Sequence, residues 1–224
     1  MSTTSTSAIE LLNRRGAKVT YQPDFFAPDE ADRQLAALLA EVQFSRPEES
    51  RVFVHGRWRA IPRLQVAYGD DGTSYRFSGC TVPARPWSQA PTLQGLRQKV
   101  REALRDGSCE ETNMMAGFDP NFVLLNLYRN GADSIGWHSD DESDLGLTPS
   151  IVSLSLGAAR DFQLRRRDAA TSRVPTVTLR LEHGSLLRFD DPTNKHWMHQ
   201  LPKRGGTHPE RIGLRLNLTW RRIV

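Results

Sequence analysis

Apolar side chains recur with a helical period in two stretches of the first half of the chain. The first stretch begins near Pro28, and its apolar residues fall at i, i+3, i+4 and i+7: Leu35, Leu38, Leu39 and Val42. Pro28 suits the first helical position. The second stretch has the same kind of stripe and ends near Asp106-Gly107: Leu93, Leu96, Val100 and Leu104. Each stretch predicts one amphipathic scaffold helix.

Short runs of strand-forming residues make up most of the rest. Residues 51–54 and 58–61 flank His55-Gly56-Arg57 and predict a β-hairpin with a basic tip. Residues 74–78 predict a short strand, and the proline-rich stretch 81–91 predicts an irregular crossing. From residue 121 onward further strands are predicted: 121–128, 150–156, 160–166, 174–181, 185–190 and 212–222. Helices followed by many strands predict an α+β fold, with helices packed on a β-sandwich or jelly roll.

We find no internal repeat and no linker, so we expect one domain over residues 21–224 after a flexible tail over residues 1–20. Met1 to Ala8 lack the apolar core of a signal peptide, and no apolar run reaches transmembrane length. The cysteines, Cys80 and Cys109, have no metal-type spacing and are expected to be reduced. These features predict an intracellular protein with no membrane partner, cytoplasmic in a bacterium or nuclear in a eukaryote.

The charge of the chain raises the question of an anionic partner. Among 224 residues there are 30 lysines and arginines, the formal net charge is +4, and the sequence pI is about 9.4. A basic protein of this kind often binds nucleic acid, but a generally basic surface explains the same numbers. Net charge alone leaves both interpretations open.

A His-x-Asp pair, His138 and Asp140, is the first candidate for chemistry. In extended backbone the two side chains lie on the same side, as two thirds of the 2-His-1-carboxylate triad that binds non-haem Fe(II). Such a pair also occurs by chance, so a third ligand is needed. His196 and His199 both lie about sixty residues later, where a jelly-roll strand can return beside the pair. Spacing favours His199 without excluding His196.

The C-terminal segment alternates strictly between two kinds of side chain. One face is apolar: Ile212, Leu214, Leu216, Leu218 and Trp220. The other face carries two arginines, an amide and a hydroxyl, and no acid: Gly213, Arg215, Asn217, Thr219 and Arg221. A solvent-exposed polar face is one interpretation. The other is a clamp for a small dianion, because guanidinium groups bind carboxylates with two hydrogen bonds.

Two polar residues interrupt the otherwise apolar strand predicted over residues 121–128. Asn126 and Tyr128 share one face of it, and a buried amide and phenol need hydrogen-bond partners. They could bond to neighbouring backbone, or they could complete a carboxylate pocket with the arginines. An iron site together with a dicarboxylate site indicates an Fe(II)- and 2-oxoglutarate-dependent oxygenase.

Taken together, these pieces resemble the AlkB family of 2-oxoglutarate-dependent dealkylases, and the resemblance covers residues 21–224. It is closest to the eukaryotic nuclear DNA-repair type, judged by residues 75–79, 138–142 and 183–187. The resemblance implies a double-stranded β-helix (jelly-roll) core over about residues 120–224. It also implies N-terminal helices and a nucleotide-recognition hairpin lid within about residues 50–90.

The resemblance also implies roles for individual residues. Fe(II) would be bound by His138, Asp140 and His199. The co-substrate 2-oxoglutarate would be held by six residues: Asn126, Tyr128, Arg215, Asn217, Thr219 and Arg221. The nucleic-acid substrate would be contacted by a further set: Tyr75, Phe77, Ser78, Asp141, Glu142, His55, Arg57 and Arg63. Of these, Asp141 and Glu142 would contact the base or orient Arg221, and the arginines would contact phosphates.

The implied activity is oxidative removal of alkyl groups from bases such as N1-methyladenine and N3-methylcytosine in DNA. It would consume Fe(II)-activated O2 and 2-oxoglutarate and release succinate, CO2 and an aldehyde. Relatives that repair duplex DNA carry a bulky finger residue where this chain has His55, which leaves the preference for single strands or duplex open. The alternatives are an RNA demethylase with the same chemistry and a catalytically silent nucleic-acid-binding protein. We expect a monomer.

Overall fold

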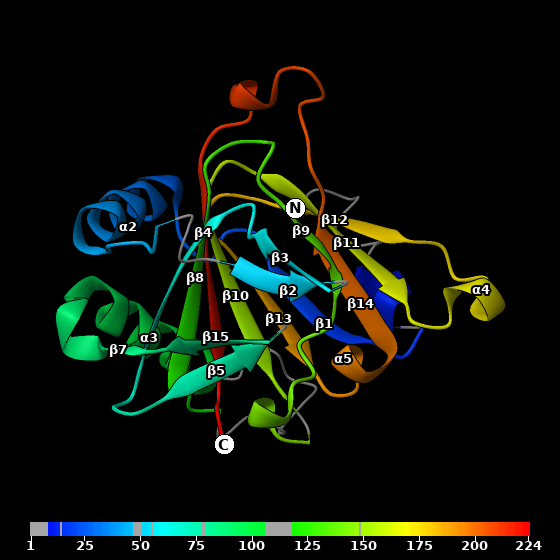
Figure 1. Cartoon of the computed structure of the whole chain (residues 1–224), viewed down its shortest axis with the longest axis horizontal. Helices are drawn as coiled ribbons and strands as arrows, with labels where there is room; N and C mark the ends of the chain where they lie inside the picture. Colours follow the sequence, from blue (N-terminus) through cyan, green and yellow to red (C-terminus); the bar gives the residue numbers. More distant parts are fainter. Residues whose placement is uncertain are drawn as a thin grey trace.

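The computed structural model describes residues 9–13, 15–46, 51–54, 56–77, 79–105, 118–147 and 149–224 (Figure 1). Its helices are α2 (Pro28–Glu41), α3 (Pro91–Arg105), α4 (Ala169–Ser172) and α5 (Thr193–His196), with short 3-10 helices η1 (Trp87–Gln89), η3 (Ser143–Leu145) and η4 (Pro209–Arg211). Its strands are β1 (Lys18–Gln22), β2 (Arg51–Val54), β3 (Arg57–Ala60), β4 (Leu64–Gly69), β5 (Ser74–Phe77), β6 (Cys80–Pro83), β7 (Arg85–Pro86), β8 (Phe122–Tyr128), β9 (Ile135–His138), β10 (Ile151–Gly157), β11 (Arg160–Arg166), β12 (Val177–Leu181), β13 (Ser185–Asp190), β14 (Trp197–Leu201) and β15 (Arg215–Arg221). Within these ranges no helix is both long and apolar enough to cross a membrane.

Two sheets form the centre of the fold. The major sheet has seven strands in the order β1-β13-β10-β15-β8-β4-β7, and the minor sheet has four in the order β12-β11-β14-β9. Neighbouring strands are antiparallel except β4 and β7. The hairpins β2–β3 and β5–β6 form two further small sheets. The predicted α+β class is confirmed.

The alternation of the central strands divides the core into two layers. Leu216, Leu218 and Trp220 of β15 pack with the helices α2 and α3 on the outer face of the major sheet. The intervening polar residues of β15 face the minor sheet, where an apolar layer surrounds a cavity. Every residue of β15 is buried, so the polar face of this strand is not a solvent-exposed surface.

Both predicted helices are present. Helix α2 begins at Pro28, and α3 buries Leu93, Leu96 and Val100. Figure 1 shows the two helices side by side on one edge of the molecule, against the major sheet. The stripe of α2 is only partly buried, because Leu38 is inaccessible whereas Leu39 is 39% exposed.

Several predicted boundaries were wrong. The predicted flexible tail extends too far, since residues 9–13 are helical, Leu12 is fully buried, and β1 pairs with β13 from Lys18 onward. The stretch 81–91, expected to be irregular, contributes part of β6 and all of β7. Strands β4, β9 and β14 were not predicted: β9 and β14 combine polar and apolar residues without clear alternation, and β4 is a short apolar run interrupted by Gln65.

A pair of glycine substitutions tests the packing of the major sheet. Gly157 at the end of β10 has φ +85°, and an added Cβ would lie 2.4 Å from the carbonyl oxygen of Leu214. We expect Gly157→Ala to lower the free energy of unfolding by more than about 2 kcal/mol, because positive φ and the backbone clash both oppose a side chain. A Cβ added to Gly95 in α3 would meet no atom within 4 Å, so Gly95→Ala should raise the free energy of unfolding by about 1 kcal/mol. Urea unfolding measures both changes, and equal effects would contradict the backbone geometry.

Candidate active site

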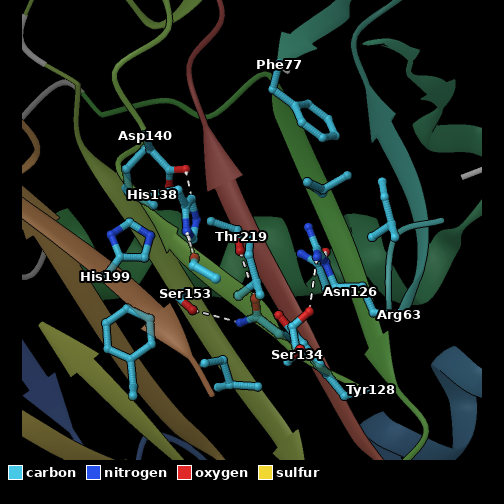
Figure 2. Close-up of a pocket in the computed structure, with 18 of the residues that line it drawn as sticks. Arg63, Phe77, Asn126, Tyr128, Ser134, His138, Asp140, Ser153, His199 and Thr219 are labelled. Atoms are coloured by element: carbon cyan, nitrogen blue, oxygen red, sulfur yellow. Dashed lines mark hydrogen bonds and ion pairs between the residues drawn. The ribbon is translucent and has the colours of Figure 1, made fainter. Parts of the chain in front are cut away.

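A cavity of about 370 Å³ lies between the two sheets. Figure 2 shows His138, Asp140 and His199 together on one side of it, with Arg63, Asn126 and Tyr128 across from them. The first group comes from the minor sheet and the loop after β9, and Asn126 and Tyr128 come from β8 of the major sheet. The cavity therefore joins side chains that are far apart in the sequence.

Three side chains are arranged as a metal-binding group. One ligand atom from each of His138, Asp140 and His199 lies within 4.8 Å of the others. The pairing of β14 with β9 places His199 directly opposite His138, and the two ring centroids are 4.2 Å apart. His196 lies outside this group, at the end of α5, with an exposed side chain. Two imidazoles and one carboxylate with space beside them suit Fe(II).

The immediate surroundings hold the two rings in place. Nδ1 of His138 is 2.9 Å from the carbonyl oxygen of Gly136, so Nδ1–H donates to it and Nε2 keeps its lone pair for a metal. The ring of His199 packs against both Phe162 and Phe189, with centroid distances of 5.2 and 5.5 Å, and those two rings also contact each other at 5.7 Å. Neither contact consumes a metal-binding atom.

The protonation states also suit a metal. Burial lowers the pKa of His138, and burial together with the neighbouring His138 lowers the pKa of His199 to about 3, so both rings are neutral near pH 7. Burial alone would raise the pKa of Asp140, but the charge of Arg221, together with electrostatic interactions with His199 and His138, outweighs it and lowers the pKa to about 2. The group therefore offers two lone pairs and one negative charge.

Two buried arginines of β15 line the same cavity. Nη2 of Arg221 donates to Asp140 Oδ2 at 3.0 Å, but its Nε and Nη1 have no hydrogen-bond partner. Nη2 of Arg215 donates to Ser155 Oγ at 2.9 Å, while its Nε has no partner and no carboxylate of the described chain forms an ion pair with it. Burial lowers the pKa of Arg215 to about 10. Such incompletely paired buried guanidinium groups fit a ligand with two carboxylates.

Amide and hydroxyl groups between the arginines are fixed by hydrogen bonds. Oδ1 of Asn126 accepts from Arg63 Nε and from Gln65 Nε2, each at 2.7 Å, which leaves its Nδ2–H groups for other partners. Asn217 donates to Ser153 Oγ at 2.7 Å and accepts from the hydroxyl of Thr219 at 2.9 Å. The ring of Tyr128 lies 5.3 Å below the guanidinium of Arg215. All six predicted co-substrate residues thus line one cavity.

Aromatic and acidic side chains line the cavity near β5. Tyr75 is 2% exposed, and its ring centroid lies 5.4 Å from that of Phe77. The hydroxyl of Tyr75 donates to Glu142 Oε2 at 2.5 Å, and burial raises the pKa of both groups. The guanidinium of Arg221 lies 5.0 Å from the centroid of the Tyr75 ring. Arg221 thus lies between the metal-binding group and an aromatic wall formed by Tyr75 and Phe77.

The other predicted substrate residues are placed differently. Asp141 is exposed and forms an ion pair with Arg167, away from the cavity lining, and Asp140 rather than Asp141 bonds to Arg221. Arg57 is exposed on β3 and does not line the cavity either. His55 and Ser78 lie outside the described residues.

Arg63 corrects an expectation. The sequence suggested a phosphate contact on the surface, but Arg63 is only 6% exposed, and it bonds to Asn126 and to the carbonyl oxygen of Ser134. Surface phosphates cannot reach it in this arrangement, because it forms part of the cavity wall. Elsewhere on the surface, Arg166 and Arg167 form ion pairs with Asp168 and Asp141.

Sequence reasoning missed several residues of the site. Gln65 is 3% exposed within the apolar strand β4, which is the same signal that identified Asn126. Ser153 and Ser155 of β10 carry that signal as well, as serines within an apolar run. Further residues of the cavity lining, among them Ser134, Phe162 and Phe189, carried no comparable signal.

The fold and the site together define a metal-dependent enzyme that binds a dicarboxylate beside its metal. In agreement, the sequence model of the 2OG-Fe(II) oxygenase superfamily matches residues 18–221. DNA oxidative demethylase ALKBH2 of Mus musculus is 41% identical over 203 residues, which cover 89% of this chain and 77% of the relative. Human ALKBH2 is 40% identical, with 89% and 71% covered. Human alkB homolog 3, an alpha-ketoglutarate-dependent dioxygenase, is 32% identical over 213 residues, with 92% and 66% covered.

This chain belongs to the AlkB family of Fe(II)- and 2-oxoglutarate-dependent dioxygenases. It spans about two thirds to three quarters of the length of these relatives. The solved structure of OsALKBH1 has the same fold, with a TM-score of 0.55 at 21% identity over 91% of this chain and 97% of the other. Fe(II), 2-oxoglutarate and O2 are therefore the expected cofactors, and the observed His-Asp-His group and the incompletely paired arginines fit them.

Proposed function

We propose that this protein removes alkyl groups from nitrogen atoms of DNA bases such as N1-methyladenine and N3-methylcytosine. The observation that carries the proposal is a single cavity that holds a 2-His-1-carboxylate group, two incompletely paired arginines and an aromatic wall. The relatives named DNA oxidative demethylase support a DNA substrate. When bound, Fe(II) with 2-oxoglutarate and O2 supplies oxidation of a C–H bond on the alkyl carbon.

The residues that line the cavity would divide between metal binding and co-substrate binding. His138, Asp140 and His199 bind the metal. Arg215 with Tyr128 orients one carboxylate of 2-oxoglutarate, and Arg221 with Asn126 orients the other, while Asn217 and Thr219 hold their neighbours in place. All of these residues line the same cavity, and Figure 2 shows His138, Asp140 and His199 facing it together with Asn126, Tyr128 and Thr219.

The substrate base would enter beside Tyr75 and Phe77. Both methylated bases carry a positive charge, so the carboxyl group of Glu142 offers an acceptor and a favourable charge near the base. A damaged base pairs poorly, which lowers the free energy needed to turn it out of a helix into an aromatic pocket. We also propose the remaining substrate contacts, Ser78, Asp141, His55, Arg57 and Arg63, with Arg63 acting from the cavity wall. In the same way we propose the division into a lid over about residues 50–90 and a core over about 120–224.

A direct assay tests the proposal. Single-stranded and duplex oligonucleotides, of DNA and of RNA, each with one N1-methyladenine, are incubated in air with the protein, Fe(II) and 2-oxoglutarate. We expect loss of the methyl group, formaldehyde release and equimolar succinate. His138→Ala should abolish all three, because it removes a metal ligand. His196→Ala is the matched control and should leave them unchanged, since this histidine lies outside the metal-binding group.

Equal behaviour of wild type and His138→Ala, with no demethylation of any substrate, would refute the enzymatic proposal. The RNA arm decides whether RNA is a substrate as well as DNA. We further propose that the protein acts as a monomer inside the cell, in the cytoplasm of a bacterium or in the nucleus of a eukaryote.

A further inference from the structure

A second hollow adjoins the active-site cavity. It is a groove of about 570 Å³, walled by residues of the hairpin β2–β3 and floored by β6. Ile61 and Phe77 line both hollows, so the two are neighbours that share a wall. The metal-binding residues and the arginines of β15 line only the first hollow. The groove therefore needs a separate explanation.

The register of the hairpin shows how it separates the two spaces. Phe53 pairs with Trp58, and Arg51 pairs with Ala60, so these residues project from one face of the hairpin. Val52 pairs with Arg59 and projects from the opposite face. Val52 lines the active-site cavity, whereas Arg51 and Trp58 line the groove. The hairpin (cyan in Figure 1) is thus a partition with one face toward each hollow.

The groove side of the hairpin exposes an aromatic surface. Trp58 is 52% exposed and Phe53 is 49% exposed, and their ring centroids are 5.4 Å apart at an angle of 59°. A cross-strand aromatic pair normally buries its rings, because each ring removes a large apolar area from water. Here the tilted ring of Phe53 supports the Trp58 ring, while Trp58 itself stays half exposed. This is the geometry of a stacking platform.

The rest of the groove lining suits a nucleotide. Arg51, exposed at the start of β2, lines the groove together with Trp58 and supplies positive charge, whereas Arg59 projects from the opposite face of the hairpin. Gln65, a buried polar side chain, also lines the groove, and it donates to Asn126 of the active-site cavity at 2.7 Å. The lining thus combines an aromatic ring, positive charge and hydrogen-bonding groups.

We propose that this groove binds the unpaired base adjacent to the target base in single-stranded nucleic acid, stacked on Trp58. The inference rests on the proposed function, since the target base must occupy the first cavity. Adjacent nucleotides on one strand would then lie on opposite faces of the hairpin, with the connecting phosphate passing close to Arg57 at the start of β3. In a duplex the adjacent base stays paired and stacked within the helix and does not enter the groove.

The test combines a change in the protein with a change in the substrate. The substrates are short single-stranded DNAs with one N1-methyladenine, whose neighbours are thymines or whose 5′ or 3′ neighbour is replaced by an abasic residue. For wild type, one of the two abasic replacements should raise KM about tenfold, since stacking of a base on an aromatic ring is worth about 1–3 kcal/mol. For Trp58→Ala, KM should be about tenfold higher with thymine neighbours, and the abasic replacement should change it no further. In both cases kcat should be unaffected.

Two further variants make the result specific. Trp58→Phe keeps a ring and should retain the sensitivity to the abasic replacement. Leu147→Ala removes another exposed apolar side chain, 90% exposed and outside both hollows, and should behave as wild type. Equal penalties for the abasic replacements in wild type and Trp58→Ala would overturn the groove assignment while demethylation continues. Failure of the proposed function would look different, with no demethylation by any variant. Fluorescence anisotropy with unmethylated versions of the same oligonucleotides measures their binding without turnover, and shows whether the effects of Trp58→Ala and of the abasic replacement depend on each other.

Discussion

Replacement of Arg215 by methionine is expected to raise the KM for 2-oxoglutarate about a hundredfold or more. Arg215 is 2% exposed, and its guanidinium lies over the ring of Tyr128 and has no carboxylate partner among the described residues. Removing one partner of a buried charged contact costs about 2–5 kcal/mol, and each 1.4 kcal/mol is about a factor of ten in affinity. Steady-state kinetics with 2-oxoglutarate varied, and calorimetric binding to the metal-loaded protein, measure the change.

The same variant should be at least as stable as wild type when no 2-oxoglutarate is present. Burial lowers the pKa of Arg215 to about 10, which means that the folded protein disfavours this charge until a ligand neutralises it. Methionine fills a similar volume without the charge. Thermal unfolding without co-substrate checks this second part.

Arg180→Met is a suitable control, because Arg180 is 53% exposed on β12 of the minor sheet. It should leave both the KM for 2-oxoglutarate and the temperature of thermal unfolding nearly unchanged. If Arg215→Met instead weakened DNA binding more than 2-oxoglutarate binding, the polar face of β15 would be a phosphate-binding surface, and the co-substrate assignment would be wrong.

The strand that carries Arg215 shows why much of the fold could be predicted. A strand of a two-layer sheet structure must satisfy a different environment on each face, and β15 alternates because Leu216 and Leu218 meet helices while Arg215 and Asn217 meet the cavity. Alternation therefore identifies both the strand and the two environments. What it could not decide was whether the polar face meets water or a ligand. That distinction depends on the minor sheet, which covers it.

Two features of the site could not be predicted from the sequence. His199 could not be separated from His196 by spacing, because the choice depends on the pairing of β14 with β9, which places His199 opposite His138. Asp141 and Glu142 looked equivalent as neighbouring acids. In the structure the backbone directs Glu142 to Tyr75 and Asp141 to Arg167. Contacts of this kind come from long-range pairing, which local periodicity does not contain.

The buried ion pair between Asp140 and Arg221 gives the second large effect. Both side chains are 6% exposed, and two nitrogens of Arg221 have no other partner. Asp140→Asn is expected to lower kcat more than a hundredfold, because even the loss of an outer-shell partner of a metal ligand costs about 10–100-fold, and here a ligand itself is altered. Metal analysis after dialysis should show loss of bound Fe(II) or of a Co(II) substitute.

The pair also stabilises the metal-free fold, and a double variant separates this role from metal binding. Removing one partner of a buried pair costs about 3–5 kcal/mol, whereas replacing both partners by uncharged groups is often nearly neutral. In metal-free protein, Asp140→Asn should therefore lower the free energy of unfolding by about 3 kcal/mol, and Arg221→Met added to it should recover most of the loss. Activity should stay absent in the double variant. If urea unfolding showed the two changes to be additive, the ion pair would contribute nothing to the fold, and Arg221 would serve only to bind the co-substrate.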